Sequence, residues 1–251
     1  MFMKAPPPID DLIKITNEIL QDKHPSAEFA FLSGSIMRGE GTLFSDLDVV
    51  VVYKNLPNAY RESFYFRGFP VETFVHTPET LNYFMFEVDR PNGFPALANM
   101  ISEGIEVPAA RAASQKLKRL AEKCLAMKPP PLSKVQIDNL RYQITNLIED
   151  IRAPRSKIEL TASGTELYAV LANFYFRANN LWSAENKSIP RVLNKTNPEL
   201  REKFCASFEE LFVEGKAERV IELTEKILQP HGGFLFEGLR LDAPAEWMKP
   251  S

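Results

Sequence analysis

The amino-acid sequence predicts an α+β domain, in which helices flank a mixed sheet, followed by an all-α helical bundle. Up to residue 128, short apolar runs of strand length alternate with helical patterns. Three prolines follow at positions 129–131, and such a run forms a stiff extended spacer. Beyond the prolines, the apolar residues recur mostly at helical spacing. We therefore expect two domains, at residues 1–128 and 132–251.

The first domain is expected to begin with a helix and two apolar strands. Apolar residues recur at helical spacing over residues 8–22, and the apolar run at 28–32 predicts the first strand. A short helix is expected to start at residues 36–38. The next apolar run, 49–53, opens with four consecutive valines and has no polar face. It therefore predicts a central strand that is covered on both sides.

A hairpin is expected over residues 64–76, with its turn at residues 67–68, where an arginine precedes a glycine. The second arm alternates, so Glu72 shares one face of the strand with Phe74 and His76. A carboxylate among apolar neighbours is costly unless it has a partner. Glu72 is therefore a candidate functional residue, whereas His76 is expected to be structural.

The remaining apolar patterns predict helices. One helix starts at residues 77–78, where a threonine cap precedes a proline, and two more occupy 95–102 and 109–127. In the second domain, four segments carry apolar stripes at helical spacing: residues 140–151, 160–175, 204–212 and 220–228. Four amphipathic helices in succession predict an antiparallel bundle.

The composition is that of an ordinary globular protein without a nucleic-acid or membrane partner. The net charge is −3 and the pI is near 5.8, so the chain lacks the basic surface of a nucleic-acid-binding protein. Cys124 and Cys205 lie far apart, as expected for reduced thiols. No apolar run has the length of a signal peptide or a membrane span. We expect a cytoplasmic protein, and a homodimer is left open.

The most informative stretch lies between the first two strands. A turn of small residues, Gly34-Ser35, follows the first strand, and Asp46 and Asp48 stand at the start of the second. Alternate residues of a strand share a face, so the two carboxylates project together. Close carboxylates repel each other unless a cation lies between them, and Mg²⁺ binds such ligands together with substrate phosphates. The glycine allows backbone N–H groups to approach a phosphate chain. This stretch predicts a metal and triphosphate site.

This order of motifs resembles the DNA polymerase β-type nucleotidyltransferase superfamily. The resemblance rests on Gly34-Ser35, on Arg38-Gly39 in the spacer, and on the Asp46-x-Asp48 pair before a valine-rich strand. The predicted layout of an α/β domain and a helical bundle is similar to that of aminoglycoside- and lincosamide-type nucleotidyltransferases. In those enzymes the nucleotide and the acceptor bind between the two domains.

The resemblance implies a reaction and a set of metal ligands. An acceptor hydroxyl attacks the α-phosphate of ATP or another nucleoside triphosphate, and pyrophosphate leaves. Two Mg²⁺ ions, for which Mn²⁺ can substitute, lie about 4 Å apart in such sites. Asp46 and Asp48 are expected to hold both ions. Glu72 matches the third carboxylate, which lies on an adjacent strand and completes the site of the ion that activates the acceptor.

The resemblance also implies which residues bind the nucleotide. Gly34 and Ser35 are expected to hold the β- and γ-phosphates, and Arg38 to neutralise charge on the pyrophosphate. In the second domain, Lys187 is the candidate for a basic residue that reaches the triphosphate. A general base is expected there too, among four carboxylates of the helical domain: Glu149, Asp150, Glu159 and Glu166.

Three functions remain open on the sequence alone. The first is AMP transfer to a small hydroxylated acceptor, for which an antibiotic is one option. The second is adenylylation of a protein, as in antitoxin-like minimal members of the superfamily. The third is a nucleotide-binding regulator without activity, against which the full set of Asp46, Asp48 and Glu72 argues.

Overall fold

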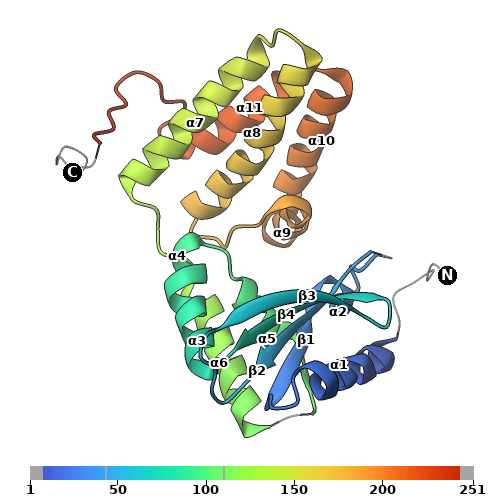
Figure 1. Ribbon diagram of the computed structural model, residues 1–251. Coiled ribbons are helices and arrows are strands. Elements are labelled where there is room, and N and C mark those ends of the chain that lie inside the picture. Colours follow the sequence, from blue (N-terminus) through green and yellow to red (C-terminus); the bar gives the residue numbers. More distant parts are fainter. Residues whose placement is uncertain (1–7, 43, 110, 244–251) are drawn as a thin grey trace, which may run out of the picture. The chain divides into compact units, whose positions relative to one another are not determined.

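The computed structural model describes residues 8–42, 44–109 and 111–243. The chain divides into two compact units, Met1–Pro129 and Pro130–Ser251, which we describe separately (Figure 1). The first unit contains a mixed sheet with helices on both faces, and the second is helical. The predicted fold class is therefore confirmed.

The first unit is built on a five-stranded sheet whose strands have the order β3-β4-β2-β1-β5 (Figure 1). Strand β2 pairs in parallel with β4, and the other pairs of neighbours are antiparallel. The strands span the following residues: β1 Phe29–Ser33, β2 Leu47–Val52, β3 Tyr60–Phe66, β4 Phe69–His76 and β5 Ile105–Val107.

The central strand β2 is buried on both faces, as its four valines predicted. Leu47, Val49 and Val51 form one core cluster with apolar residues of helix α1 (Ile9–Lys23). Asp48 alternates with these residues, so it projects from the opposite face. Helix α5 (Ala96–Glu103) packs against β1 and β2. The Asp48 carboxylate therefore lies on the face of the sheet that is opposite helix α1.

The remaining helices of the first unit are shorter or lie mostly after strand β4 in the chain. Helix α3 (Pro78–Tyr83) begins as predicted, because the Thr77 hydroxyl accepts a hydrogen bond from the Thr80 amide at 3.3 Å. A turn of π-helix at Phe84–Asp89 extends it. The other three are α2 Gly34–Met37, α4 Arg90–Asn92 and α6 Ala112–Met127. The strand β5, between α5 and α6, was not predicted from the sequence.

The second unit packs four long helices around its own apolar core. They match the four predicted stripes, and a fifth, shorter helix α9 was not predicted. The helices span these residues: α7 Lys134–Arg152, α8 Lys157–Ala178, α9 Ile189–Thr196, α10 Pro198–Glu214 and α11 Glu218–Leu228. Two 3₁₀ turns lie at Asn186–Ser188 and Gln229–His231.

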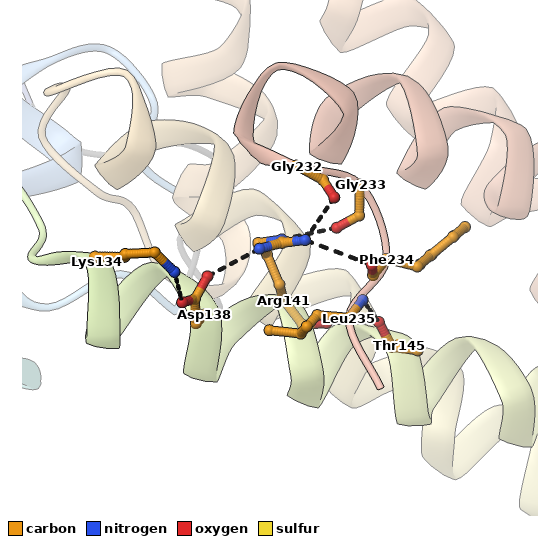
Figure 2. Close-up of polar contacts among 8 residues, drawn as sticks. All are labelled: Lys134, Asp138, Arg141, Thr145, Gly232, Gly233, Phe234 and Leu235. Atoms are coloured by element: carbon orange, nitrogen blue, oxygen red, sulfur yellow. Dashed lines mark hydrogen bonds and ion pairs between the residues drawn. The ribbon is translucent and has the colours of Figure 1, made fainter. Parts of the chain in front are cut away.

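A buried arginine ties the segment after α11 to helix α7 (Figure 2). The Arg141 side chain donates to the carbonyl oxygens of Gly233 at 2.7 Å, Gly232 at 2.5 Å and Phe234 at 3.4 Å. It also pairs with Asp138 at 2.8 Å. One turn further along α7, a threonine hydroxyl accepts a hydrogen bond from the backbone of the same segment. This segment is thereby part of the bundle.

Among the helices of the described residues, none combines the length and the apolar character that a membrane span requires.

Candidate active site

The sheet brings the three predicted carboxylates together near the start of its central strand β2. In the parallel pair of β2 and β4, Asp48 lies opposite Glu72. Asp46 precedes β2 by one residue, and its side chain lies on the same side as Asp48. One carboxylate oxygen from each of the three residues lies within 4.8 Å of the others. The pairing of β2 with β4 places Asp48 beside Glu72, and Asp46 joins them because it lies only two residues before Asp48.

The charge of this cluster is unfavourable without a cation. Burial, together with the negative charges of Asp46 and Glu72, raises the pKa of Asp48 to about 6. Two arginines, Arg38 and Arg61, act in the opposite direction because their positive charges favour the ionised carboxylate. A positive charge that enters the cluster would therefore stabilise the ionised form of Asp48.

The cluster fits a hard divalent cation. All three ligands are carboxylate oxygens, which Mg²⁺ and Mn²⁺ prefer, and they are spaced closely enough to share an ion. A divalent cation would also remove the repulsion that raises the pKa of Asp48. Within the part of the chain that the structure describes, Asp46, Asp48 and Glu72 are thus a group of side chains that could hold a metal.

Gly34 lies directly against the cluster, and only glycine fits there. Its φ is +88°, in the left-handed region that other residues rarely adopt. A Cβ atom at this position would overlap the Asp48 carboxylate, with Asp48 Cγ at only 2.8 Å. The close approach arises because Ser33, the residue before Gly34, lies opposite Asp48 in the β1–β2 pair. The turn therefore places open backbone beside the carboxylates.

Ser35 is buried at the start of α2, and its hydroxyl donates to the Ser45 hydroxyl at 3.3 Å. Ser45 in turn accepts a hydrogen bond from the Thr42 amide at 2.8 Å. These bonds connect the turn after β1 to the segment that carries Asp46. Ser35 thus lies next to the site, with its hydroxyl engaged by a neighbour.

Arg38 lies close enough to the site to influence Asp48 electrostatically. Its guanidinium pairs with Glu40 at 3.2 Å and with Glu103, in the last turn of α5, at 2.9 Å. Binding of a phosphate by Arg38 would have to compete with these two carboxylates.

Two residues of β3 contact the site and were not identified from the sequence. Arg61 forms an ion pair with Glu72, and the Ser63 hydroxyl donates to Glu72 Oε1 at 3.4 Å. The sequence contained the information that places both residues. A two-residue turn at 67–68 places Ser63 opposite Glu72 and Arg61 opposite Phe74, as the β3–β4 register has it. The predicted first arm began only at Phe64, which left both residues outside the hairpin.

The candidates in the second unit are exposed. Lys187 lies in the 3₁₀ turn after α8. Three of the four candidate bases have local partners: Glu149 pairs with an arginine one turn away, Glu159 accepts from the backbone near the start of α8, and Glu166 accepts from a glutamine of α7. None of these contacts distinguishes one carboxylate as a general base.

Residues 13–89 match a known protein family. The family model is that of the nucleotidyltransferase domain, and the matched range contains Gly34, Asp46, Asp48 and Glu72. Among solved structures, the chain is similar to a nucleotidyltransferase-like protein from Exiguobacterium sibiricum, with 13% identity and a TM-score of 0.43. That similarity covers 87% of this chain and 75% of the other. No curated protein matches the chain. The family match identifies residues 13–89 as a nucleotidyltransferase domain, which confirms the predicted resemblance and enzyme class.

Proposed function

We propose that the protein transfers a nucleoside monophosphate, AMP from ATP, to a hydroxyl group of a small acceptor in a Mg²⁺-dependent reaction. The observation that carries the proposal is the cluster of three carboxylates, with oxygens within 4.8 Å of one another, inside the matched nucleotidyltransferase domain. In the reaction the acceptor oxygen bonds to the α-phosphorus as the bond to the β-phosphate oxygen breaks. Pyrophosphate leaves, and the acceptor loses its proton to a base.

Asp46, Asp48 and Glu72 would hold the divalent ions, either two Mg²⁺ or Mn²⁺ in their place. When bound, such ions neutralise phosphate charge and lower the pKa of a bound hydroxyl. The part of the protein is to fix the three carboxylates before the substrate arrives. Asp48 and Glu72 lie on adjacent strands and Asp46 lies directly before one of them, which supports this role because strands hold side chains more rigidly than loops do.

The turn after β1 would hold the β- and γ-phosphates. Gly34 supports this role because its backbone lies against the cluster without a side chain. Ser35 and Arg38 are adjacent and offer a hydroxyl and a positive charge. Lys187, an exposed lysine of the second unit, is the further candidate for the triphosphate.

A pyrophosphate-release assay tests the proposal. The protein is incubated with ATP, Mg²⁺ and a panel of hydroxylated small molecules that includes aminoglycosides and lincosamides. We expect pyrophosphate in proportion to adenylylated acceptor, and no turnover when EDTA replaces Mg²⁺. Asp48→Asn should reduce turnover about a thousandfold, since it removes a metal ligand without changing size.

Asp22→Asn is the matched control, because Asp22 is an exposed aspartate that pairs with Lys23 in α1. This variant should retain full turnover. Labelling of proteins from the host, with no small acceptor modified, would favour adenylylation of a protein instead. Folded protein that releases no pyrophosphate with any triphosphate or acceptor would refute the proposed transfer.

A further inference from the structure

Both oxygens of the Glu72 carboxylate are held from the neighbouring strand β3. The Arg61 guanidinium forms an ion pair with Oε2, and the Ser63 hydroxyl donates to Oε1 at 3.4 Å. No ion pair reaches Asp46 or Asp48 within the part of the chain that the structure describes. The three carboxylates of the site are therefore unequal: one has a protein cation as its partner, and two do not.

The position of Arg61 is set by the strand and by an aromatic ring. Arg61 lies opposite Phe74 in the β3–β4 register, and its guanidinium lies 5.0 Å from the centre of the Phe74 ring. The side chain is nevertheless 57% exposed, because β3 is an edge strand. An exposed arginine can leave its partner and be hydrated at little cost, since exposed ion pairs contribute little free energy.

We propose that Arg61 is a built-in counter-ion of Glu72, which a divalent cation must displace before Glu72 can serve as a metal ligand. This inference rests on the proposed function, in which Glu72 binds a metal. A guanidinium and a metal ion on the same carboxylate repel each other, so the two compete. Arg61 is thus a positioning residue: it holds Glu72 in place in the metal-free protein and weakens the binding of a cation that needs Glu72.

The inequality of the three carboxylates predicts two steps of metal binding. A cation that binds through Asp46 and Asp48 displaces no protein group. A cation that also requires Glu72 has to release the Arg61 ion pair. The second step should therefore be weaker than the first, and Arg61 should set the difference.

Mn²⁺ titration followed by electron paramagnetic resonance, on the full-length protein without nucleotide, tests this inference. Arg61→Gln should tighten the second, weaker step of Mn²⁺ binding about fivefold, the ratio expected for the loss of one exposed ion pair. Arg67→Gln is the matched control. Arg67 lies in the turn of the same hairpin and pairs with Glu18 of α1 at 2.9 Å, away from the site, so its removal should leave the affinity unchanged.

A double-mutant cycle separates direct competition from a general effect of charge. In the background of Glu72→Gln, the substitution Arg61→Gln should change Mn²⁺ affinity far less, because the contact that it removes is already absent and only its weaker charge effect on Asp48 remains. Equal tightening with and without Glu72 would show that Arg61 acts only through its distant charge, and would overturn the proposal. Unchanged or weaker binding by Arg61→Gln alone would overturn it as well.

The titration also distinguishes failure of this inference from failure of the proposed function. Loss of Mn²⁺ binding in Asp48→Asn, together with no effect of Arg61→Gln, would retain the metal site and reject the role of Arg61. Mn²⁺ binding that survives in Asp48→Asn would reject the metal site itself, and with it both proposals.

Discussion

At the scale of single residues, Asp48 is a carboxylate whose charge fits its surroundings poorly when no cation is bound. Burial and two neighbouring carboxylates raise its pKa from the ordinary 3.8 to about 6. Such a rise corresponds to roughly 2 to 3 kcal/mol of unfavourable free energy for the charged form. The metal-free protein therefore holds Asp48 charged at a cost in stability, which is a common feature of functional sites.

The first prediction concerns the removal of this charge. At pH 7 and with EDTA, Asp48→Asn should raise the free energy of unfolding by about 2 kcal/mol, because a neutral amide replaces a repelled carboxylate. Added Mg²⁺ should stabilise the wild type but not the variant. Thermal denaturation with and without Mg²⁺ measures both effects.

Asp22→Asn, on the exposed face of α1, should behave like the wild type in both conditions. Destabilisation by Asp48→Asn with EDTA would contradict this account.

The second prediction uses two glycines of the same segment. Gly34 and Gly39 both have positive φ, +88° and +71°, so alanine is strained at either position. Only at Gly34 would the new Cβ meet the Asp48 carboxylate; around Gly39 nothing lies within 4 Å. Gly34→Ala should therefore abolish Mn²⁺ binding at the site, whereas Gly39→Ala should lower stability by about 1 kcal/mol and retain binding. Equal losses of Mn²⁺ affinity in the two variants would show that backbone strain alone matters.

The sequence predicted the residues of the cluster better than their partners. Asp46, Asp48 and Glu72 follow from strand alternation and a recognisable motif, and the structure brings them together. Arg61 was missed because the first arm of the hairpin is mostly exposed, so it lacks the apolar alternation by which a strand is recognised. The pairing of Arg38 with Glu103 could not be predicted, because these residues lie 65 positions apart and only the packing of α5 joins them.

At the scale of elements, the third prediction concerns the clamp between α7 and the segment after α11, by which we mean the hydrogen bonds of Arg141 to the backbone of residues 232–234. Arg141 is buried and donates to three backbone carbonyl oxygens (Figure 2). Its removal would leave these acceptors unpaired. Arg141→Ala should lower the free energy of unfolding by about 3 kcal/mol. Urea unfolding followed by tryptophan fluorescence is a suitable measurement, since both tryptophans, Trp182 and Trp247, lie after residue 130.

Arg152 provides the control for this prediction. It lies at the end of the same helix, is about half exposed, and pairs with Glu149 at 3.8 Å. Arg152→Ala should change the free energy of unfolding by less than about 0.5 kcal/mol. A similar urea midpoint for the two variants would mean that the clamp contributes no more than a surface ion pair.

The elements that the sequence missed are short. Strand β5 has three residues and is recognisable only through its pairing with β1, where Val107 lies opposite Ala30. Helix α9 has eight residues and follows a 3₁₀ turn, so it offers barely two turns of periodicity. The long helices and the central strand were predicted because each buries a full face, and burial is what the apolar pattern reports.

At the scale of the whole molecule, stability against pH is a sum over groups that can act in opposite directions. Burial lowers the pKa of His76 to about 4, and its Nδ1 lies 3.1 Å from the Thr80 hydroxyl. The unfolded chain therefore takes up a proton at His76 near pH 6.5, before the folded protein does. The stability that neutral His76 provides is complete above pH 6.5 and is lost as the pH falls towards 4.

Asp48 acts with the opposite sign over the same range. The folded protein keeps its proton up to about pH 6, whereas the unfolded chain loses it near 3.8, so stability falls as the pH rises between these values. The two contributions partly cancel between pH 4 and 6.5.

The fourth prediction is that Asp48→Asn removes this compensation. Relative to the wild type, its advantage in unfolding free energy should fall from about 2 kcal/mol at pH 7 to near zero at pH 4. Urea unfolding of both proteins in EDTA at half-unit pH steps measures the difference in unfolding free energy between them. The contributions of all other titratable groups cancel in this difference. An advantage that stays constant with pH would mean that Asp48 has the same pKa in the folded and unfolded protein.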